Sequence, residues 1–173
     1  MDEFGLAGVT SARARVVRDF AASELFDRTF HEGMQLVEET AAYLDGAGRQ
    51  ESKLLSRDTA LAYASESMRL TTRLMQVASW LLVQRAVREG DMAPSEACAA
   101  RYRLNTEASA QHPEGTEQPA GLTALSDRAE RLYERVAHLD RRMYLDGTDE
   151  GVPHPVLSQM DRLRDAFPGL RAS

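Results

Sequence analysis

Apolar residues recur at spacings of three and four along much of this chain, which is the pattern of amphipathic helices. The first clear run predicts a helix over residues 23–45, with Ser23 as its N-cap. Gly46 follows, and we expect it to end the helix in a left-handed conformation. The apolar side chains that share one face of this helix are Phe26, Phe30, Met34, Val37, Ala41 and Leu44. That face must be buried against another part of the protein.

A longer helix is predicted over residues 56–89, with Ser56 as its N-cap and Gly90 at its end. Helical-wheel angles divide its apolar residues between two nearly opposite sides. One side carries Leu61, Ala64, Met68, Met75 and Leu82, and the other carries Tyr63, Leu70, Leu74, Val77 and Leu81. A helix that is apolar on two sides needs two sets of neighbours. We interpret these as its own bundle and a second copy of the chain, and we assign bundle or dimer packing to Leu70, Leu74, Val77 and Leu81.

The most regular apolar repeat lies further along the chain. It alternates spacings of three and four, as a heptad seam does, through Leu122, Leu125, Ala129, Leu132, Val136, Leu139 and Met143. A short helix is predicted before it, over residues 94–104, with Pro94 in the first turn. Residues 105–121 have no apolar periodicity and contain two prolines and two glycines. We predict a flexible loop there.

The two ends of the chain are expected to differ from the middle. Residues 1–20 predict a loose N-terminal arm or a short helix, residues 21–146 the bundle domain, and residues 147–173 a flexible tail. The tail contains a short amphipathic segment, which we expect either to dock on the bundle or to fold with a partner, marked by Val156, Met160, Leu163 and Phe167. The sequence has no strand-like alternation. The predicted fold is therefore all-α, an antiparallel bundle of three to four helices with a long central helix.

Length and composition narrow the class of protein. The chain has 173 residues, enough for one domain, and a formal charge of −6, which argues against a DNA-associated helical regulator or another nucleic-acid binder. Its single cysteine, Cys98, cannot form an intrachain disulfide and fits a reducing compartment. The longest apolar stretch, residues 77–83, is too short to span a membrane, and the first residues do not resemble a signal peptide. We expect a cytoplasmic protein.

Residues with chemistry do not form a familiar catalytic or metal-binding pattern. The histidines His31, His112, His138 and His154 lack the spacing of zinc or di-iron ligands, so we expect no metal, no cofactor and no enzymatic activity. The main alternative is a histidine phosphotransfer bundle, which needs only an exposed histidine on a helix. His31 and His138 are the candidates, although neither has the nearby Lys-Gly that such modules usually present.

One edge of the long helix is a candidate docking surface. Arg69 and Arg73 flank Trp80 on the wheel, between the two apolar sides, and tryptophan and arginine dominate interface hot spots. The alternative is that these arginines pair with Glu38, Glu39 or Glu66 at the rim of the bundle. The sequence leaves both interpretations open.

Three stretches of the chain resemble a known family. They are residues 67–87 (SMRLTTRLMQVASWLLVQRAV), residues 23–30 (SELFDRTF), and residues 42–46 (AYLDG) with the Gly48-Arg49 pair that follows. They are similar to the regulator of CtrA degradation family of alphaproteobacteria, whose broader members were grouped as an uncharacterised domain. The match is strong over residues 20–105 and looser over the seam helix, and the long central run makes it specific.

The resemblance implies a function that the residue pattern alone does not. It implies a homodimeric helical bundle that acts as an adaptor in regulated proteolysis by ClpXP, working with other protease adaptors and a ClpX-type unfoldase to deliver the cell-cycle regulator CtrA. No catalytic residue carries over from the family. The family's functional C-terminal region corresponds to residues beyond about 146. We expect the partner-binding residues to be Arg69, Arg73, Trp80, Val156, Met160, Leu163 and Phe167.

Overall fold

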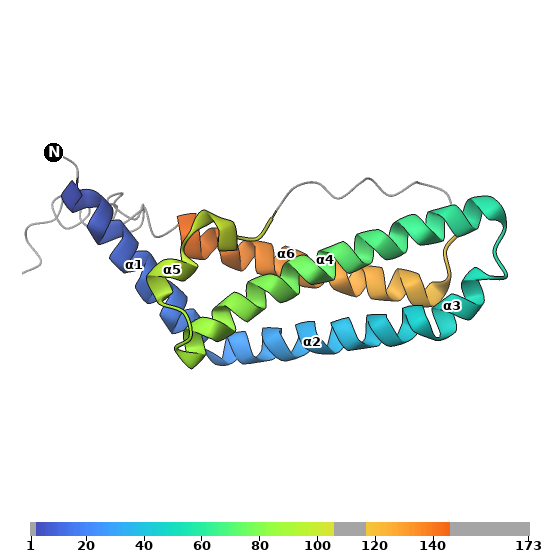
Figure 1. The fold of residues 1–173 in the computed structure, drawn as a ribbon, viewed down its shortest axis with the longest axis horizontal. Coiled ribbons are helices and arrows are strands. Elements are labelled where there is room, and N and C mark those ends of the chain that lie inside the picture. The colour runs from blue at the N-terminus through green and yellow to red at the C-terminus, as the bar shows by residue number, and fades with distance from the viewer. Residues whose placement is uncertain (1–2, 106–116, 146–173) are drawn as a thin grey trace, which may run out of the picture.

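A computed structural model describes residues 3–105 and 117–145 of the chain. Within these ranges the backbone forms helices and short connections, without a strand, as predicted. The elements are α1 Glu3–Ala21, α2 Glu24–Asp45, α3 Ala47–Ser52, α4 Arg57–Glu89, α5 Pro94–Ala97, the 3-10 helix η1 Ala100–Tyr102, and α6 Ala120–Leu145 (Figure 1). None of the described helices is long and apolar enough to cross a membrane. Residues 106–116 of the predicted loop and the amphipathic segment 156–167 lie outside the described ranges.

The helix ends follow the predicted capping residues, with one exception. Ser23 and Ser56 each accept a hydrogen bond from a backbone N–H at the start of α2 and α4, and Gly90 ends α4 with a left-handed φ of 82°. The left-handed conformation predicted for Gly46 is wrong, because its φ is −108°. The chain continues directly into α3 at this point, and a Cβ on Gly46 would lie 2.8 Å from the carbonyl oxygen of Ala42. Glycine is required there by close backbone approach.

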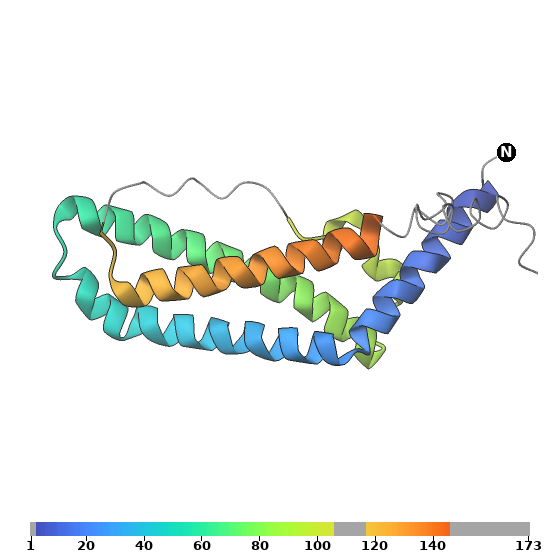
Figure 2. The same ribbon diagram turned by 180° about the vertical axis from the view of Figure 1, so that it is seen from behind.

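Helices α2, α4 and α6 pack lengthwise and form the body of the molecule (Figures 1 and 2). The predicted antiparallel arrangement holds for α2, since Asp27 near its start pairs with Arg88 near the end of α4. Helices α4 and α6 run parallel, however, because contacts advance together along both, from Arg69 with Glu130 to Trp80 with Asp140. Helix α6 therefore starts at the same end of the bundle as α4.

The core lies between these three helices. Six of the seven predicted seam positions of α6 are buried and Leu139 is partly buried. Facing them, Leu70, Leu74, Val77 and Leu81 of α4 are at most 4 % exposed. These four residues pack within the bundle in the single chain, which is one of the two roles that the sequence allowed.

The N-terminal residues join this core. Residues 3–21 form α1, where the sequence allowed a loose arm or a short helix. Val17 and Ala21 are completely buried, and the ring of Phe20 packs against those of Phe26 and Trp80. Helix α1 continues past the end of the bundle at an angle to it (Figures 1 and 2). The C-terminal half of α1 thus closes one end of the three-helix core.

The helix predicted over residues 94–104 is shorter than expected. It is divided into α5 and η1, because side chains of α6 bind backbone groups that a continuous helix would use. The hydroxyl of Tyr144 donates to the carbonyl of Ala97 at 2.9 Å, and the N–H of Leu104 donates to Asp140 at 3.3 Å. Burial raises the pKa of the Tyr144 hydroxyl to about 12, so it stays a proton donor at neutral pH.

Candidate functional site

Trp80, predicted to contact a partner, belongs to the core. Its side chain is 2 % exposed, and its indole Nε1 donates a hydrogen bond of 2.9 Å to Oδ1 of Asp140 on α6. The same buried carboxylate accepts hydrogen bonds from the backbone N–H of Leu104 and from Arg103. Asp140 is therefore an anchor that joins α4, α6 and the segment after η1. This position does not fit the predicted docking role of Trp80, because the indole has no accessible face for a partner.

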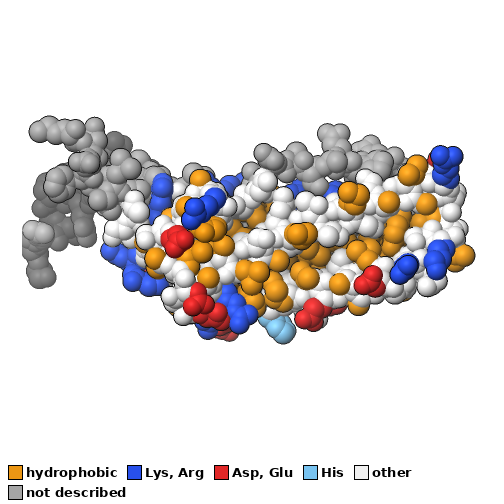
Figure 3. Space-filling model, viewed as in Figure 1, with side chains coloured by type: hydrophobic (Ala, Val, Ile, Leu, Met, Phe, Trp, Pro, Cys, Tyr) orange, Lys and Arg blue, Asp and Glu red, His pale blue; other side chains and the backbone are white. Residues whose placement is uncertain are grey.

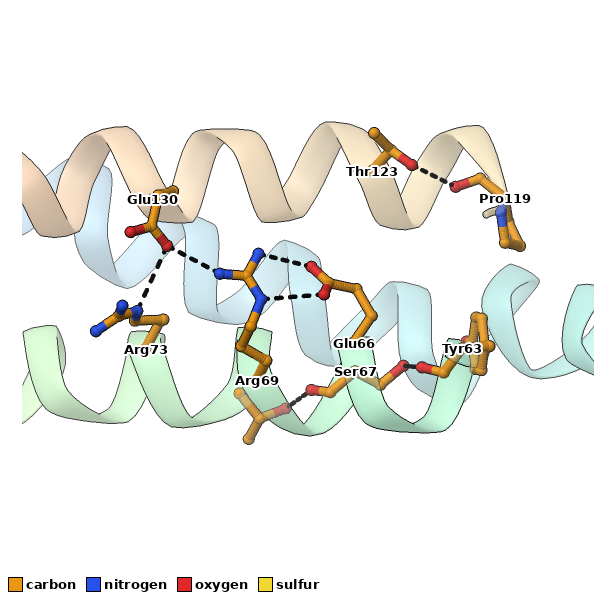
Figure 4. Close-up of polar contacts among 9 residues, drawn as sticks. Tyr63, Glu66, Ser67, Arg69, Arg73, Pro119, Thr123 and Glu130 are labelled. Carbon is orange, nitrogen blue, oxygen red and sulfur yellow. Dashed lines mark hydrogen bonds and ion pairs between the residues drawn. The ribbon is translucent and has the colours of Figure 1, made fainter. Parts of the chain in front are cut away.

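Arg69 and Arg73 also act inside the bundle. Figure 4 shows Arg69 of α4 between Glu66 of the same helix, at 2.8 Å, and Glu130 of α6, at 3.1 Å. Arg73 approaches Glu130 at 3.4 Å and stacks over the ring of Tyr133 at 3.9 Å. The hydrogen bonds that Arg69 donates to the Glu66 carboxylate raise the pKa of the guanidinium further above its usual range. The alternative prediction, pairing with Glu66, is confirmed for Arg69, and this edge is a clamp between α4 and α6.

We expect Arg69→Ala to lower the free energy of unfolding by about 2 kcal/mol, less than for a fully buried pair. The change leaves the carboxylate of Glu66, which is 3 % exposed, without its guanidinium partner. Urea unfolding followed by circular dichroism measures the effect. Arg85→Ala is the matched control, because Arg85 and Glu89 form a pair with both side chains about half exposed. Equal effects of the two substitutions would contradict the clamp.

The other apolar side of α4 faces outward. Leu61, Met68, Met75 and Leu82 stand seven residues apart and are 51 to 71 % exposed. We call these four residues the α4 outer stripe. Figure 3 shows apolar side chains gathered along this face, over α4 and the neighbouring α2, with charged side chains toward its margins. Single exposed apolar residues are ordinary, but a continuous row of them marks an interaction surface.

The α4 outer stripe is also free of charge. From residue 61 to residue 82 the only charged residues are Glu66, Arg69 and Arg73, and all three are turned toward α6. The polar neighbours of the stripe on α4 are neutral, and most are small: Ser65, Thr71, Thr72 and Ser79, with the larger Gln76 beside Met75. An exact seven-residue repeat drifts around a straight helix by about 20° per repeat, which suits a left-handed crossing with another helix. The stripe therefore has the form of a seam that accepts a partner helix.

Among the remaining candidates, His31 on α2 and His138 on α6 are exposed, whereas His112 and His154 lie outside the described residues. Within the described ranges, no three His, Cys, Asp or Glu side chains come together as metal ligands would.

The model of a family described as a protein of unknown function (DUF1465) matches residues 17–167. No curated protein sequence matches the chain. The crystal structure of RcdA from Caulobacter crescentus CB15 is 70 % identical in sequence, with a TM-score of 0.62, and the match covers 74 % of this chain and 98 % of that one. The chain therefore belongs to the DUF1465 family and, within it, to the RcdA family.

Proposed function

We propose that this protein is a non-enzymatic, cytoplasmic adaptor in regulated proteolysis, which helps to deliver cell-cycle regulators such as CtrA to the ClpXP protease. The observation that carries the proposal is the 70 % identity to RcdA over nearly the whole of the crystallised chain. Delivery requires no chemistry, because tethering raises the effective concentration of cargo near the unfoldase and modest affinities suffice.

An affinity capture experiment tests the proposal. The purified protein serves as bait in lysate from its native cells, and the bound proteins are identified by mass spectrometry. Recovery of ClpX, of a ClpX adaptor, or of CtrA is the expected result. Recovery of none of these under conditions that retain known ClpX partners would contradict the proposal.

We further propose that the working form is a homodimer joined through the α4 outer stripe. The four exposed side chains repeat at the coiled-coil period, and the residues around them are uncharged and mostly small, which allows close approach of two helices. A two-fold axis across the stripe would place the same uncharged surface on both copies, as an isologous interface requires.

The C-terminal residues Val156, Met160, Leu163 and Phe167, outside the described ranges, remain our proposed cargo- or adaptor-binding element. We expect deletion of residues 147–173 to slow adaptor-dependent degradation several-fold in a reconstituted reaction while leaving the bundle folded, because the described core ends at α6. Degradation rates and circular dichroism, measured on the same preparations, check both parts. A truncated protein with an undiminished rate would refute the assignment.

The second candidate function is histidine phosphotransfer. It is supported by the exposure of His31 and His138, each on a long helix. Incubation with a labelled phosphodonor kinase distinguishes the two functions. An adaptor acquires no acid-labile label, whereas a phosphotransfer protein acquires label that His31→Gln or His138→Gln abolishes.

A further inference from the structure

A ladder of ion pairs joins α2 to α6 on the side of the bundle away from the Arg69 clamp. Arg128 pairs with Glu39, and Arg135 pairs with Glu32 at 2.5 Å. The two arginines are seven residues apart, and so are the two glutamates, in opposite directions. Seven residues before Glu32, the same spacing reaches position 25 of α2, where a leucine stands instead of an acidic residue. The ladder therefore stops at Leu25.

A groove opens where the ladder stops. We call it the α2–α6 groove; its volume is about 650 Å³, and it is lined by Leu25, Arg28, Thr29, Arg131, Glu134, Arg135, His138 and Leu139. Leu25 is 52 % exposed although it faces this depression, and Leu139 lies beside it on α6. The groove thus combines an apolar floor with a rim that carries three arginines and one glutamate.

Arg131 gives the rim one cation that an acidic group of an occupant can pair with. Arg28 contacts Glu24 at 2.5 Å, with both side chains more than 70 % exposed, so water already screens this pair. Arg135 is held by Glu32, and Arg131 has no ion-pair partner among the described residues. The remaining titratable groups on the rim are Glu134 and His138. An apolar segment that follows an acidic stretch of chain would cover the floor and bring a carboxylate to Arg131.

We propose that residues 156–167 of the same chain dock in the α2–α6 groove. Helix α6 ends at Leu145, six residues after Leu139, which places its end about 9 Å along the axis from the groove. The ten residues 146–155 can span up to roughly 33 Å, enough for the chain to turn back and reach it. The groove is therefore within reach of the segment without any rearrangement of the bundle.

The sequence of this region fits the groove through the charge of the linker and the apolar spacing of the segment. The charges of the segment itself cancel, with Asp161 and Asp165 against Arg162 and Arg164. Residues 146–155 contain Asp146, Asp149 and Glu150 and no lysine or arginine, which suits the arginine rim. The segment then presents Val156, Met160, Leu163 and Phe167 at spacings of four, three and four, so one helical face can cover Leu25 and Leu139.

If the segment docks in this way, the α2–α6 groove competes with any partner protein that binds the segment. A partner would have to displace the segment from the groove, so its apparent affinity would equal its intrinsic affinity multiplied by the fraction of molecules in which the segment is undocked. The docking is a contact within one chain and does not depend on the proposed role in proteolysis.

Paramagnetic relaxation in the full-length protein tests the proposal. A nitroxide is attached at Ser158→Cys in a Cys98→Ser background, and the methyl signals of Leu25, Leu139, Leu61 and Leu82 are recorded by NMR. We expect loss of intensity at Leu25 and Leu139 and little change at Leu61 and Leu82. Intensity loss confined to the α4 methyls, or no loss at any of the four, would overturn the proposal.

Two controls identify the cause of the effect. The double variant Arg28→Glu with Arg131→Glu should restore the Leu139 signal, since it reverses the charge of the rim at two exposed positions. A signal that stays attenuated contradicts the charge argument.

The second control mixes isotope-labelled protein that lacks the nitroxide with unlabelled protein that carries it. This mixture should give no attenuation. Attenuation in the mixture would show that the segment comes from a second copy, which also overturns the same-chain proposal.

Discussion

Replacing Met68 and Met75 by glutamate should convert the proposed homodimer into a monomer without unfolding the bundle. Both side chains are at least 64 % exposed in the single chain, so the substitutions cost the fold little. In a dimer they remove four buried methionines and bring like charges together. The loss is on the order of 4 kcal/mol, or about a thousandfold in the dimer dissociation constant.

Sedimentation velocity over a range of concentrations measures this effect, and circular dichroism verifies the fold. The matched control is Leu25→Glu, which places the same charge at an apolar position of similar exposure on another face. We expect the control to dimerise like the unmodified protein. A dimer that survives the double substitution would show that the α4 outer stripe is not the interface.

Replacing Asp140 by alanine should destabilise the bundle more than Arg69→Ala does. The change removes the acceptor of the Trp80 indole and of the Leu104 N–H, both in buried positions, and leaves these donors unsatisfied. The expected loss is about 3 kcal/mol in the free energy of unfolding, or roughly 10 °C in melting temperature.

Asp140→Asn is the control that separates hydrogen bonding from charge. The amide keeps an oxygen that can accept from Trp80 and Leu104, so we expect it to lose clearly less stability than Asp140→Ala. Thermal unfolding of both variants provides the comparison. An alanine variant as stable as the unmodified protein would show that Asp140 does not anchor these elements.

Local features of the fold were predictable from the sequence because they depend on local interactions. Ser23 and Ser56 cap helices through contacts with residues three positions away. Gly90 can adopt a left-handed backbone conformation whatever the positions of the other helices. The α6 seam was also predictable, since seven apolar positions in a regular repeat have one face to bury. These signals do not require knowledge of the neighbouring helices.

Other features depend on how the helices are placed against one another. Trp80 lies at the margin of the two apolar sides of α4, and only the position of α6, with Asp140 opposite, determines that it is buried. The parallel direction of α4 and α6 shows in the contacts between the two helices, and apolar periodicity within one helix does not specify it. The α2–α6 groove exists because the register of two helices places Leu25 after Glu32 in the ion-pair ladder. No single-helix pattern contains that information.

The candidate surface was partly predictable for a related reason. The wheel correctly separated Leu61, Met68, Met75 and Leu82 from the set that packs inside the bundle. It did not reveal that the charged residues near them turn toward α6, and that orientation is what leaves the stripe uncharged.

The rate at which ClpXP degrades CtrA in a reconstituted reaction, with and without this protein, tests the adaptor role most directly. The complete set of the organism's other ClpX adaptors is included in both reactions, and a CtrA-independent ClpXP substrate serves as control. An adaptor should accelerate degradation of CtrA and leave the control substrate unchanged. Equal CtrA degradation rates with and without the protein, under conditions where it remains folded, would contradict the proposed function.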